Sequence, residues 1–200
     1  MAFDLKQYLS ARRDLVEAEL GKLGKQAAHV HGDAGHTPGK LGEAMNYSLL
    51  AGGKRLRPIL AMAGCEAMGK PADVALRFGC AVEMIHTYSL IHDDLPSMDN
   101  DDFRRGRPTN HKVYGEALAI LAGDALLTDA FALVTQSPAS AEVIVELVRE
   151  LSFAAGSPGM VGGQVIDVEA TGKKVDIGHL KLLHAMKTGA LFDVSLRGGA

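Results

Sequence analysis

The sequence predicts an all-α protein, a bundle of long helices with a site that faces inward. Aromatic residues make up 5% of the chain and tryptophan is absent, whereas a sheet-rich protein normally carries more aromatic and β-branched residues. Apolar residues recur at helical spacing along most of the chain, and no segment shows the alternation of a strand.

The first two helices are expected on either side of a loop. Residues 3–23 place leucines between charged residues, which is typical of an amphipathic helix, and residues 41–50 begin the second helix. Residues 24–39 combine glycines and a proline and predict a flexible loop. This loop also holds three histidines, His29, His31 and His36. Only Asp33 accompanies them, so we favour a solvated loop over a metal site.

The next two helices are expected at residues 59–68 and 72–94, with a turn at 69–71 between them. Pro58 suits a helix start, where its missing N–H group is not needed. The second of these helices is the central one, because residues 79–91 are apolar. Its large side chains follow helical spacing at Val82, Ile85, Tyr88 and Ile91.

Four more helices are expected, at residues 116–135, 141–155 and 160–170, and after the capping residue Asp176. Gly162 and Gly163 lie inside the third of these. A glycine costs a helix roughly 1 kcal/mol, so we expect close packing or substrate passage to require them. Lys187 and Thr188 lie inside the last helix, where Thr followed by Gly has poor propensity, and this favours a functional role.

Composition excludes several classes of protein. The net charge of −3 gives no indication of a nucleic-acid partner. No uncharged run of 18 residues exists, which argues against a membrane span. The first residues lack an apolar signal core, and Cys65 and Cys80 lie in apolar helical stretches, so we expect a cytoplasmic protein with buried thiols. Two hundred residues suffice for one domain with a core, and we expect a single domain over 1–200.

The stretch from His92 to Arg107 is the centre of the predicted site. Five carboxylates lie within ten residues, and three arginines follow: Asp93, Asp94, Asp99, Asp101, Asp102, Arg104, Arg105 and Arg107. Carboxylates at the end of a buried helix repel one another, and a divalent cation removes that repulsion. An all-oxygen site suits Mg²⁺, which substrate phosphates usually complete, and the arginine fork matches phosphate oxygens.

Three other interpretations compete with a magnesium site at this stretch. A solvated acidic loop is the commonest, but the order of apolar helix, D-D-x-x-x-x-D and R-R-G argues against it. An EF-hand fails, because Arg104 takes the sixth place from Asp99, where glycine is required. The pair His92-Asp93 would also fit a metal-dependent phosphohydrolase.

A second anion site is indicated by G-G-K-R-L-R-P at residues 52–58. Two glycines let the backbone approach a ligand closely, and three cations follow them. The spacing is not that of a Walker A loop. A helix break with surface charges is the alternative, and the acidic site nearby favours a diphosphate anchor.

These blocks resemble the trans-isoprenyl diphosphate synthases, in particular the bacterial farnesyl diphosphate synthase type. The match is carried by residues 52–58, 86–102 and 104–111, and by L-A-G-D-A-L-L at 121–127, G-G-Q-V-I-D at 162–167 and K-T-G at 187–189. The resemblance implies an isoprenoid synthase-type helical bundle with a central cavity for Mg²⁺ and diphosphate. It also implies a prenyltransferase that joins isopentenyl diphosphate to an allylic diphosphate, with a C15 product.

The resemblance also assigns roles to matching positions. Asp93, Asp94 and Asp99 would hold Mg²⁺, two or three ions in all, and Arg104 would bind the allylic diphosphate. Isopentenyl diphosphate would bind through Lys54, Arg57, His86 and Arg105. The Lys187 carbonyl, the Thr188 hydroxyl and the Gln164 amide would line the cation site, with Asp167 supporting Lys187.

Chain length would be set below the metal site. Tyr88 lies five residues before Asp93, about 7–8 Å down a helix. Tyr88 and its neighbour Ser89 would therefore form the floor that stops elongation, as in the C15 producers of the family.

One departure limits this resemblance. The family carries a second Asp-rich motif on a later helix, but the only D-D pairs here are 93–94 and 101–102. We therefore expect a truncated synthase that lacks the C-terminal third of the family and part of the metal site, in a family that is usually homodimeric. The alternatives are a geranylgeranyl diphosphate synthase, a non-catalytic synthase-like subunit and a Mg²⁺-dependent phosphohydrolase.

Overall fold

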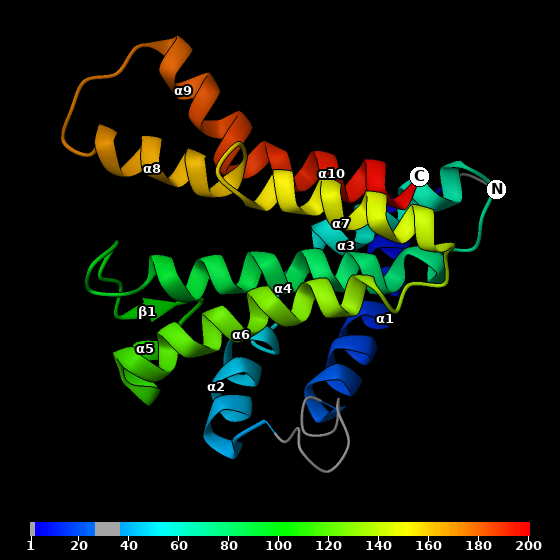
Figure 1. The fold of residues 1–200 in the computed structure, drawn as a ribbon, viewed down its shortest axis with the longest axis horizontal. Helices are drawn as coiled ribbons and strands as arrows, with labels where there is room; N and C mark the ends of the chain where they lie inside the picture. Colours follow the sequence, from blue (N-terminus) through cyan, green and yellow to red (C-terminus); the bar gives the residue numbers. More distant parts are fainter. Residues whose placement is uncertain (1–2, 27–36) are drawn as a thin grey trace. The chain divides into compact units, whose positions relative to one another are not determined.

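The computed structural model describes residues 3–26 and 37–200 (Figure 1). The helices are α1 (Leu5–Gln26), α2 (Gly39–Leu49), α3 (Leu56–Ala67), α4 (Leu76–Asp93), α5 (Asn110–Tyr114), α6 (Glu116–Val134), α7 (Ala141–Ala155), α8 (Met160–Ala170), α9 (Ile177–His184) and α10 (Ala190–Gly199). A 3₁₀ turn (Ala72–Ala75) precedes α4, and a π-helical turn (Ala185–Gly189) joins α9 to α10. The predicted all-α class is confirmed.

One prediction about strands was wrong. Two short antiparallel strands, β1 (Phe103–Arg104) and β2 (Arg107–Pro108), form a hairpin after the acidic stretch. They are the only strands in the described part of the chain. Two-residue strands are too short for a periodic pattern, so the sequence does not predict them.

Most predicted helix bounds agree with the structure. The predicted bounds of α7 and α8 are the observed ones, and Asp176 caps α9 by accepting a hydrogen bond from the His179 N–H at 2.8 Å. The loop predicted at residues 24–39 is shorter, because α1 extends to Gln26 and α2 begins at Gly39. Residues 27–36 of that loop, which include the three histidines, lie outside the described residues.

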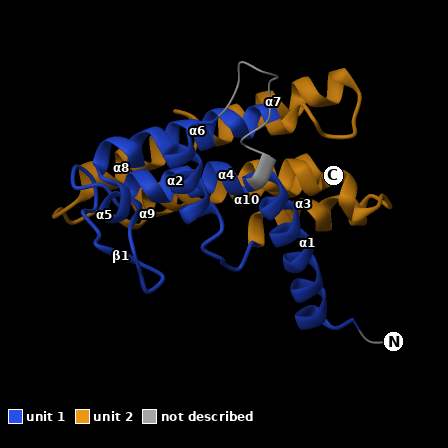
Figure 2. Ribbon diagram, turned by 90° about the horizontal axis from the view of Figure 1, so that it is seen from below, with its two compact units in different colours: residues 1–55, 83–132 blue, residues 56–82, 133–200 orange. Residues whose placement is uncertain are grey.

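The chain divides into two compact units (Figure 2), which are described separately below. Unit 1 comprises the described residues of 1–55 and 83–132, and unit 2 comprises 56–82 and 133–200. The single domain expected over 1–200 stays a prediction.

Helix α6 contributes one of its faces to the core of unit 1. On α6 the fully buried residues Ala119, Ala122, Leu126 and Ala130 recur every three or four positions, which is the spacing of one helix face. The opposite face of the same helix exposes Ile120 and Leu121.

Helix α6 is also the one helix in the described residues that is long and apolar enough to span a bilayer. This rests on length and composition alone, and 39% of the apolar window is buried in the structure. A core helix passes the same test. The predicted absence of a membrane span therefore stays a prediction.

Unit 2 holds α3 against α10 through glycines. A Cβ atom on Gly64 would lie 2.3 Å from the Leu196 carbonyl oxygen, and one on Gly199 would lie 1.9 Å from that of Ala61. Both of these oxygens belong to the backbone, so a side-chain rotation cannot remove either clash. The two helices therefore depend on glycine to approach as closely as they do.

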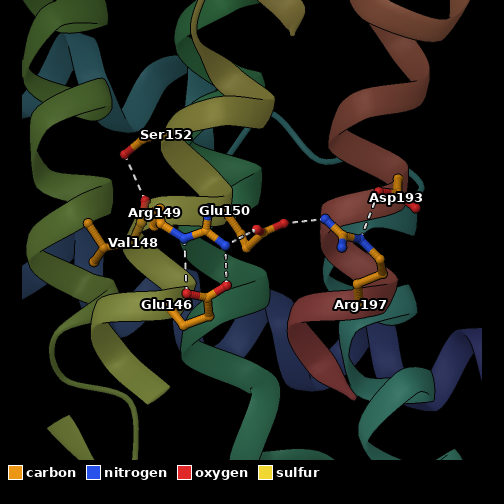
Figure 3. A network of polar contacts seen from close by, with 7 residues as sticks. All are labelled: Glu146, Val148, Arg149, Glu150, Ser152, Asp193 and Arg197. Atoms are coloured by element: carbon orange, nitrogen blue, oxygen red, sulfur yellow. Dashed lines mark hydrogen bonds and ion pairs between the residues drawn. The ribbon is translucent and has the colours of Figure 1, made fainter. Parts of the chain in front are cut away.

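An exposed ion network joins α7 to α10 in the same unit (Figure 3). On α7, Arg149 binds Glu146 and Glu150. On α10, Arg197 binds Asp193 of its own helix and Glu150 of α7. These side chains are largely exposed, so their contribution to the free energy of unfolding is small.

We predict that Gly64→Ala lowers the free energy of unfolding by about 1–3 kcal/mol, because the new methyl group forces α3 and α10 apart. Gly21→Ala is the matched control: nothing lies within 4 Å of a Cβ there. Alanine is the better helix former, so this control should gain about 0.5–1 kcal/mol. Urea unfolding curves of both variants measure the difference, and equal midpoints would contradict the close packing.

Candidate functional site

The acidic stretch begins where α4 ends. Pro96 cannot continue the helix, and the chain folds back so that the Asp99 N–H donates to the Asp93 carbonyl at 2.9 Å. Asn100 follows with a positive φ of 53°. This conformation is uncommon for residues other than glycine, and asparagine adopts it more readily than most. The first and last aspartates of D-D-x-x-x-x-D are therefore neighbours.

Asp94 behaves differently from the other aspartates, because it is buried and bound to Arg104. Its side chain is 4% exposed. The Arg104 Nε lies 2.8 and 3.0 Å from the two carboxylate oxygens, and Nη2 lies 2.6 Å from Oδ1. The hydrogen bond to Asp94 raises the pKa of the Arg104 guanidinium. The structure thus joins a predicted metal ligand to a predicted diphosphate ligand.

The hairpin presents the arginines. Phe103 pairs with Pro108 and Arg104 with Arg107. The turn between the strands is Arg105-Gly106, with φ values of 53° and 76°. Positive φ at both turn residues gives the twist that two-residue hairpin loops favour.

Helix α2 holds the hairpin in place. The Tyr47 hydroxyl donates to the Pro108 carbonyl at 2.8 Å, and the Arg107 guanidinium lies 4.4 Å from the centre of the Tyr47 ring. Asn110 then donates to the Ala44 carbonyl and to the Ser48 hydroxyl, both at 2.8 Å. The strand and the helix α5 that follows it are therefore both tied to α2.

The loop after α2 meets the hairpin turn. Arg105 donates a hydrogen bond to the Gly52 carbonyl, and a Cβ on Gly53 would lie 2.7 Å from Arg105 Nη1. Because Gly53 has no side chain, the Arg105 guanidinium can occupy this space. Lys54 follows with an exposed side chain.

A small open cavity of ≈ 50 Å³ lies in unit 1 between these elements. Its charged lining includes His86, Asp94, Arg104 and Arg105. The structure therefore brings together three predicted substrate ligands and one predicted metal ligand. Leu90 and Ile91 of α4 add an apolar wall.

Tyr88 and Ser89, the predicted floor, lie on the same stretch of α4. Tyr88 is 7% exposed, and its ring meets the His92 ring edge-on at 5.6 Å. Burial, and to a lesser degree the charge of Asp93, raise the pKa of the Tyr88 hydroxyl. The Ser89 hydroxyl donates to the His86 carbonyl at 2.9 Å.

The main chains of two predicted metal ligands, Asp93 and Asp99, meet at the end of α4. Carboxylate oxygens are the ligand type that Mg²⁺ prefers, and it needs only one or two of them when substrate phosphates supply the remaining oxygens. Among the described residues no group of three or more His, Cys, Asp and Glu side chains is gathered for a metal. The pairing of Asp94 with Arg104 is one reason.

The remaining predicted residues belong to unit 2. Lys187 Nζ lies 2.6 Å from Asp167 Oδ2, so the predicted support of Lys187 by Asp167 has a direct contact behind it. Arg57 lies over the Phe192 ring at 4.7 Å. Gln164 is partly buried and Thr188 is exposed.

Lys187 and Thr188 lie in the π-helical turn. Single π turns are rare within helices and are found frequently at functional sites. A Cβ on Gly163 would lie 2.2 Å from the Lys187 backbone nitrogen. Close packing against this turn therefore explains the glycine inside α8, one of the two reasons expected from the sequence.

A family profile described as polyprenyl synthetase matches residues 38–200. The chain belongs to the polyprenyl synthetase family. It is 49% identical over 199 residues to a farnesyl diphosphate synthase from Geobacillus stearothermophilus, covering 98% of this chain and 64% of the relative. It is also 49% identical over 202 residues to a chloroplastic geranylgeranyl pyrophosphate synthase from Catharanthus roseus, covering 100% of this chain and 54% of the relative.

A solved structure agrees with this assignment. An FPP/GFPP synthase from Zymomonas mobilis matches with a TM-score of 0.86 at 43% identity, over 96% of this chain and 69% of that one. The predicted family and its helical fold are confirmed. The chain spans less than two thirds of the length of the two relatives named above.

One group of this candidate site was not predicted from the sequence. Arg55 and Glu83 are buried and form an ion cluster in unit 1 with the partly exposed Glu17, and Arg55 and Glu83 both line the cavity. A signal was present, since Glu83 is a charged residue inside the apolar stretch of the central helix.

We predict that Arg104→Met lowers the free energy of unfolding by about 2 kcal/mol, because it leaves the buried Asp94 carboxylate without its charged partner. Arg13→Met is the control. Arg13 is an exposed arginine that meets only Asp14, at 4.0 Å, so its loss should cost less than about 0.5 kcal/mol. Chemical denaturation measures both variants, and equal stabilities would contradict the importance of the pair.

Proposed function

We propose that this polyprenyl synthetase family member is a short-chain trans-prenyltransferase that joins isopentenyl diphosphate to an allylic diphosphate, with farnesyl diphosphate as its product. The observation that carries the proposal is the unit 1 cavity, at which Asp94, Arg104 and Arg105 meet beside the paired Asp93 and Asp99. Clefts that combine apolar walls with a few convergent charges are the usual form of a small-molecule site.

Each part of the cavity suits one part of the reaction. Arg104 keeps 33% of its side chain exposed while bound to Asp94, so its guanidinium remains within reach of allylic diphosphate oxygens. Arg105, His86 and Lys54 would bind isopentenyl diphosphate. Leu90 and Ile91 would keep water from the allylic cation.

Asp93 and Asp99 would hold Mg²⁺, two or three ions in all with the remainder of the site. Bound there, magnesium neutralises the charge that develops on the leaving diphosphate. Arg104 adds a fixed positive charge to the same oxygens. The C1–O bond of the allylic diphosphate breaks and the diphosphate leaves with the electron pair. The double bond of isopentenyl diphosphate then forms a new bond to C1, and a proton passes to the released diphosphate as the new alkene forms.

The roles in unit 2 remain part of the proposal. Gln164, Lys187 and Thr188 would stabilise the cation with their oxygens, and Asp167 would hold Lys187. The π turn and the Asp167–Lys187 contact support this assignment. We propose a homodimer in the cytoplasm, with no nucleic-acid partner and no membrane span.

A geranylgeranyl diphosphate synthase is the second candidate. The relative from Catharanthus roseus carries that name at the same 49% identity as the farnesyl diphosphate synthase. The two candidates share all the chemistry of the site and differ only in how far the product grows.

Incubation of the purified protein with isopentenyl and dimethylallyl diphosphates tests the proposal. A synthase yields longer prenyl diphosphates, a phosphohydrolase yields inorganic phosphate, and a non-catalytic subunit yields neither. Within this assay we predict that Asp93→Ala lowers kcat by roughly a hundredfold or more, because a metal ligand is lost.

The control for that variant is Asp102→Ala, an aspartate of the same acidic run that pairs with Lys112 at 2.9 Å instead. It should keep kcat within about threefold, since it lies outside D-D-x-x-x-x-D. Near-normal turnover in Asp93→Ala would refute the metal role of that residue.

We predict that Tyr88→Ala shifts the products towards longer chains, because removal of a buried ring opens space below the acidic end of α4. Mass spectrometry of the prenyl products measures the change. Tyr114→Ala, which removes a ring from α5, is the control and should leave the product distribution unaltered. If Tyr88→Ala leaves product size unchanged, Tyr88 is not the floor.

A further inference from the structure

The buried cation in the loop after α2 is Arg55, and three elements of unit 1 converge on it. Arg55 Nε lies 2.8 Å from Glu17 of α1, and Nη1 lies 3.0 Å from Glu83 of α4. Nη2 donates to the carbonyl of Leu49, the last residue of α2, at 2.7 Å. Arg55 is 3% exposed, and its contacts with Glu83 and Leu49 are buried, whereas the Glu17 side chain keeps 34% of its surface exposed.

The charges of this cluster do not cancel. Two carboxylates share one guanidinium, and Glu83 Oε2 is buried with no hydrogen-bond partner. Burial lowers the pKa of Arg55, but Glu17 and Glu83 together raise it further, so the net shift is upward. Arg55 is therefore firmly held as a cation, and its removal would leave the buried Glu83 carboxylate without its charged partner.

The backbone at Arg55 needs this support. Arg55 has a φ of 50°, a conformation that costs a residue with a side chain and persists only where the surroundings enforce it. Gly52 and Gly53 precede it with φ values of 75° and 152°. The loop thus has little conformational preference of its own, and the side chain of Arg55 determines where it lies.

The other side of this loop contacts the hairpin turn. The Gly52 carbonyl accepts a hydrogen bond from Arg105, and Gly53 leaves space for the same guanidinium. Lys54 stands between this contact and Arg55, with its side chain exposed. Arg55 within the unit and Arg105 at the cavity therefore hold the loop from opposite ends.

We propose that Arg55 is a positioning residue for the isopentenyl diphosphate subsite. Through Glu17, Glu83 and the Leu49 carbonyl it sets the path of residues 52–54, which places Lys54 beside Arg105. The N–H donors of Arg55 are almost all used within the cluster. Nε and Nη2 bind the two carboxylate oxygens of Glu17, Nη2 also binds the Leu49 carbonyl, and Nη1 binds Glu83. This inference rests on the proposed function and goes beyond it, because it makes helix α1 part of what shapes the substrate site.

Arg55→Lys tests the role, because lysine keeps the charge but cannot reach three acceptors at once. We expect the KM for isopentenyl diphosphate to rise about tenfold, while the KM for the allylic diphosphate stays within about twofold. A general loss of stability would raise neither KM selectively. Calorimetric titration with isopentenyl diphosphate should show the same tenfold loss of affinity without turnover.

Arg149→Lys is the matched control. Arg149 also lies between two glutamates, Glu146 and Glu150, but on the exposed surface of unit 2 (Figure 3). The same chemical change there should leave both KM values unaltered.

A second variant guards against loss of folding. Arg55→Met combined with Glu83→Gln removes both buried charges together, which avoids an unpaired ion in the interior. It should show the same selective rise in the KM for isopentenyl diphosphate. Equal changes in both KM values, or none, in either variant would overturn the positioning role. A wild-type protein that neither binds nor condenses isopentenyl diphosphate would instead overturn the proposed function.

Discussion

The ion pair between Asp94 and Arg104 is the contact on which the site in unit 1 depends. A carboxylate buried at the end of α4 requires a cation, and the hairpin supplies one from β1. The second strand is tied to α2 by Tyr47. One buried charge therefore connects the central helix, the hairpin and α2, and the cavity lies among them.

The buried Arg55 follows the same principle of charge pairing. Arg55 and Arg105 both take positive φ values, and with Asn100 they are the only such non-glycine residues in the described part of the chain. All three belong to the loops around the acidic stretch and the loop after α2. Unfavourable backbone conformations therefore occur at the candidate site, where charge pairs and turns stabilise them. The exposed network of Glu146, Arg149 and Arg197 stabilises no such conformation.

Much of the fold followed from periodicity. The bounds of α7 and α8, the cap at Asp176 and the helical class were predicted from local patterns. The hairpin was missed because strands of two residues have no period to detect. The π turn was missed because Lys187 and Thr188 differ from ordinary helical residues only in helix propensity. The contact that accompanies the turn is made by Gly163 of α8, which is distant in the sequence.

The sequence alone determined the family and the all-α class, and it predicted the kind of chemistry, because these depend on residue types at short spacings such as D-D-x-x-x-x-D and R-R-G. The tertiary structure decided which charges meet. Asp94 turns to Arg104, ten residues away, and Arg55 turns inward to Glu17, thirty-eight residues away, instead of outward with Lys54. Neighbouring aspartates or cations look alike in sequence, and long-range packing decides which of them is buried against a charged partner and which stays exposed.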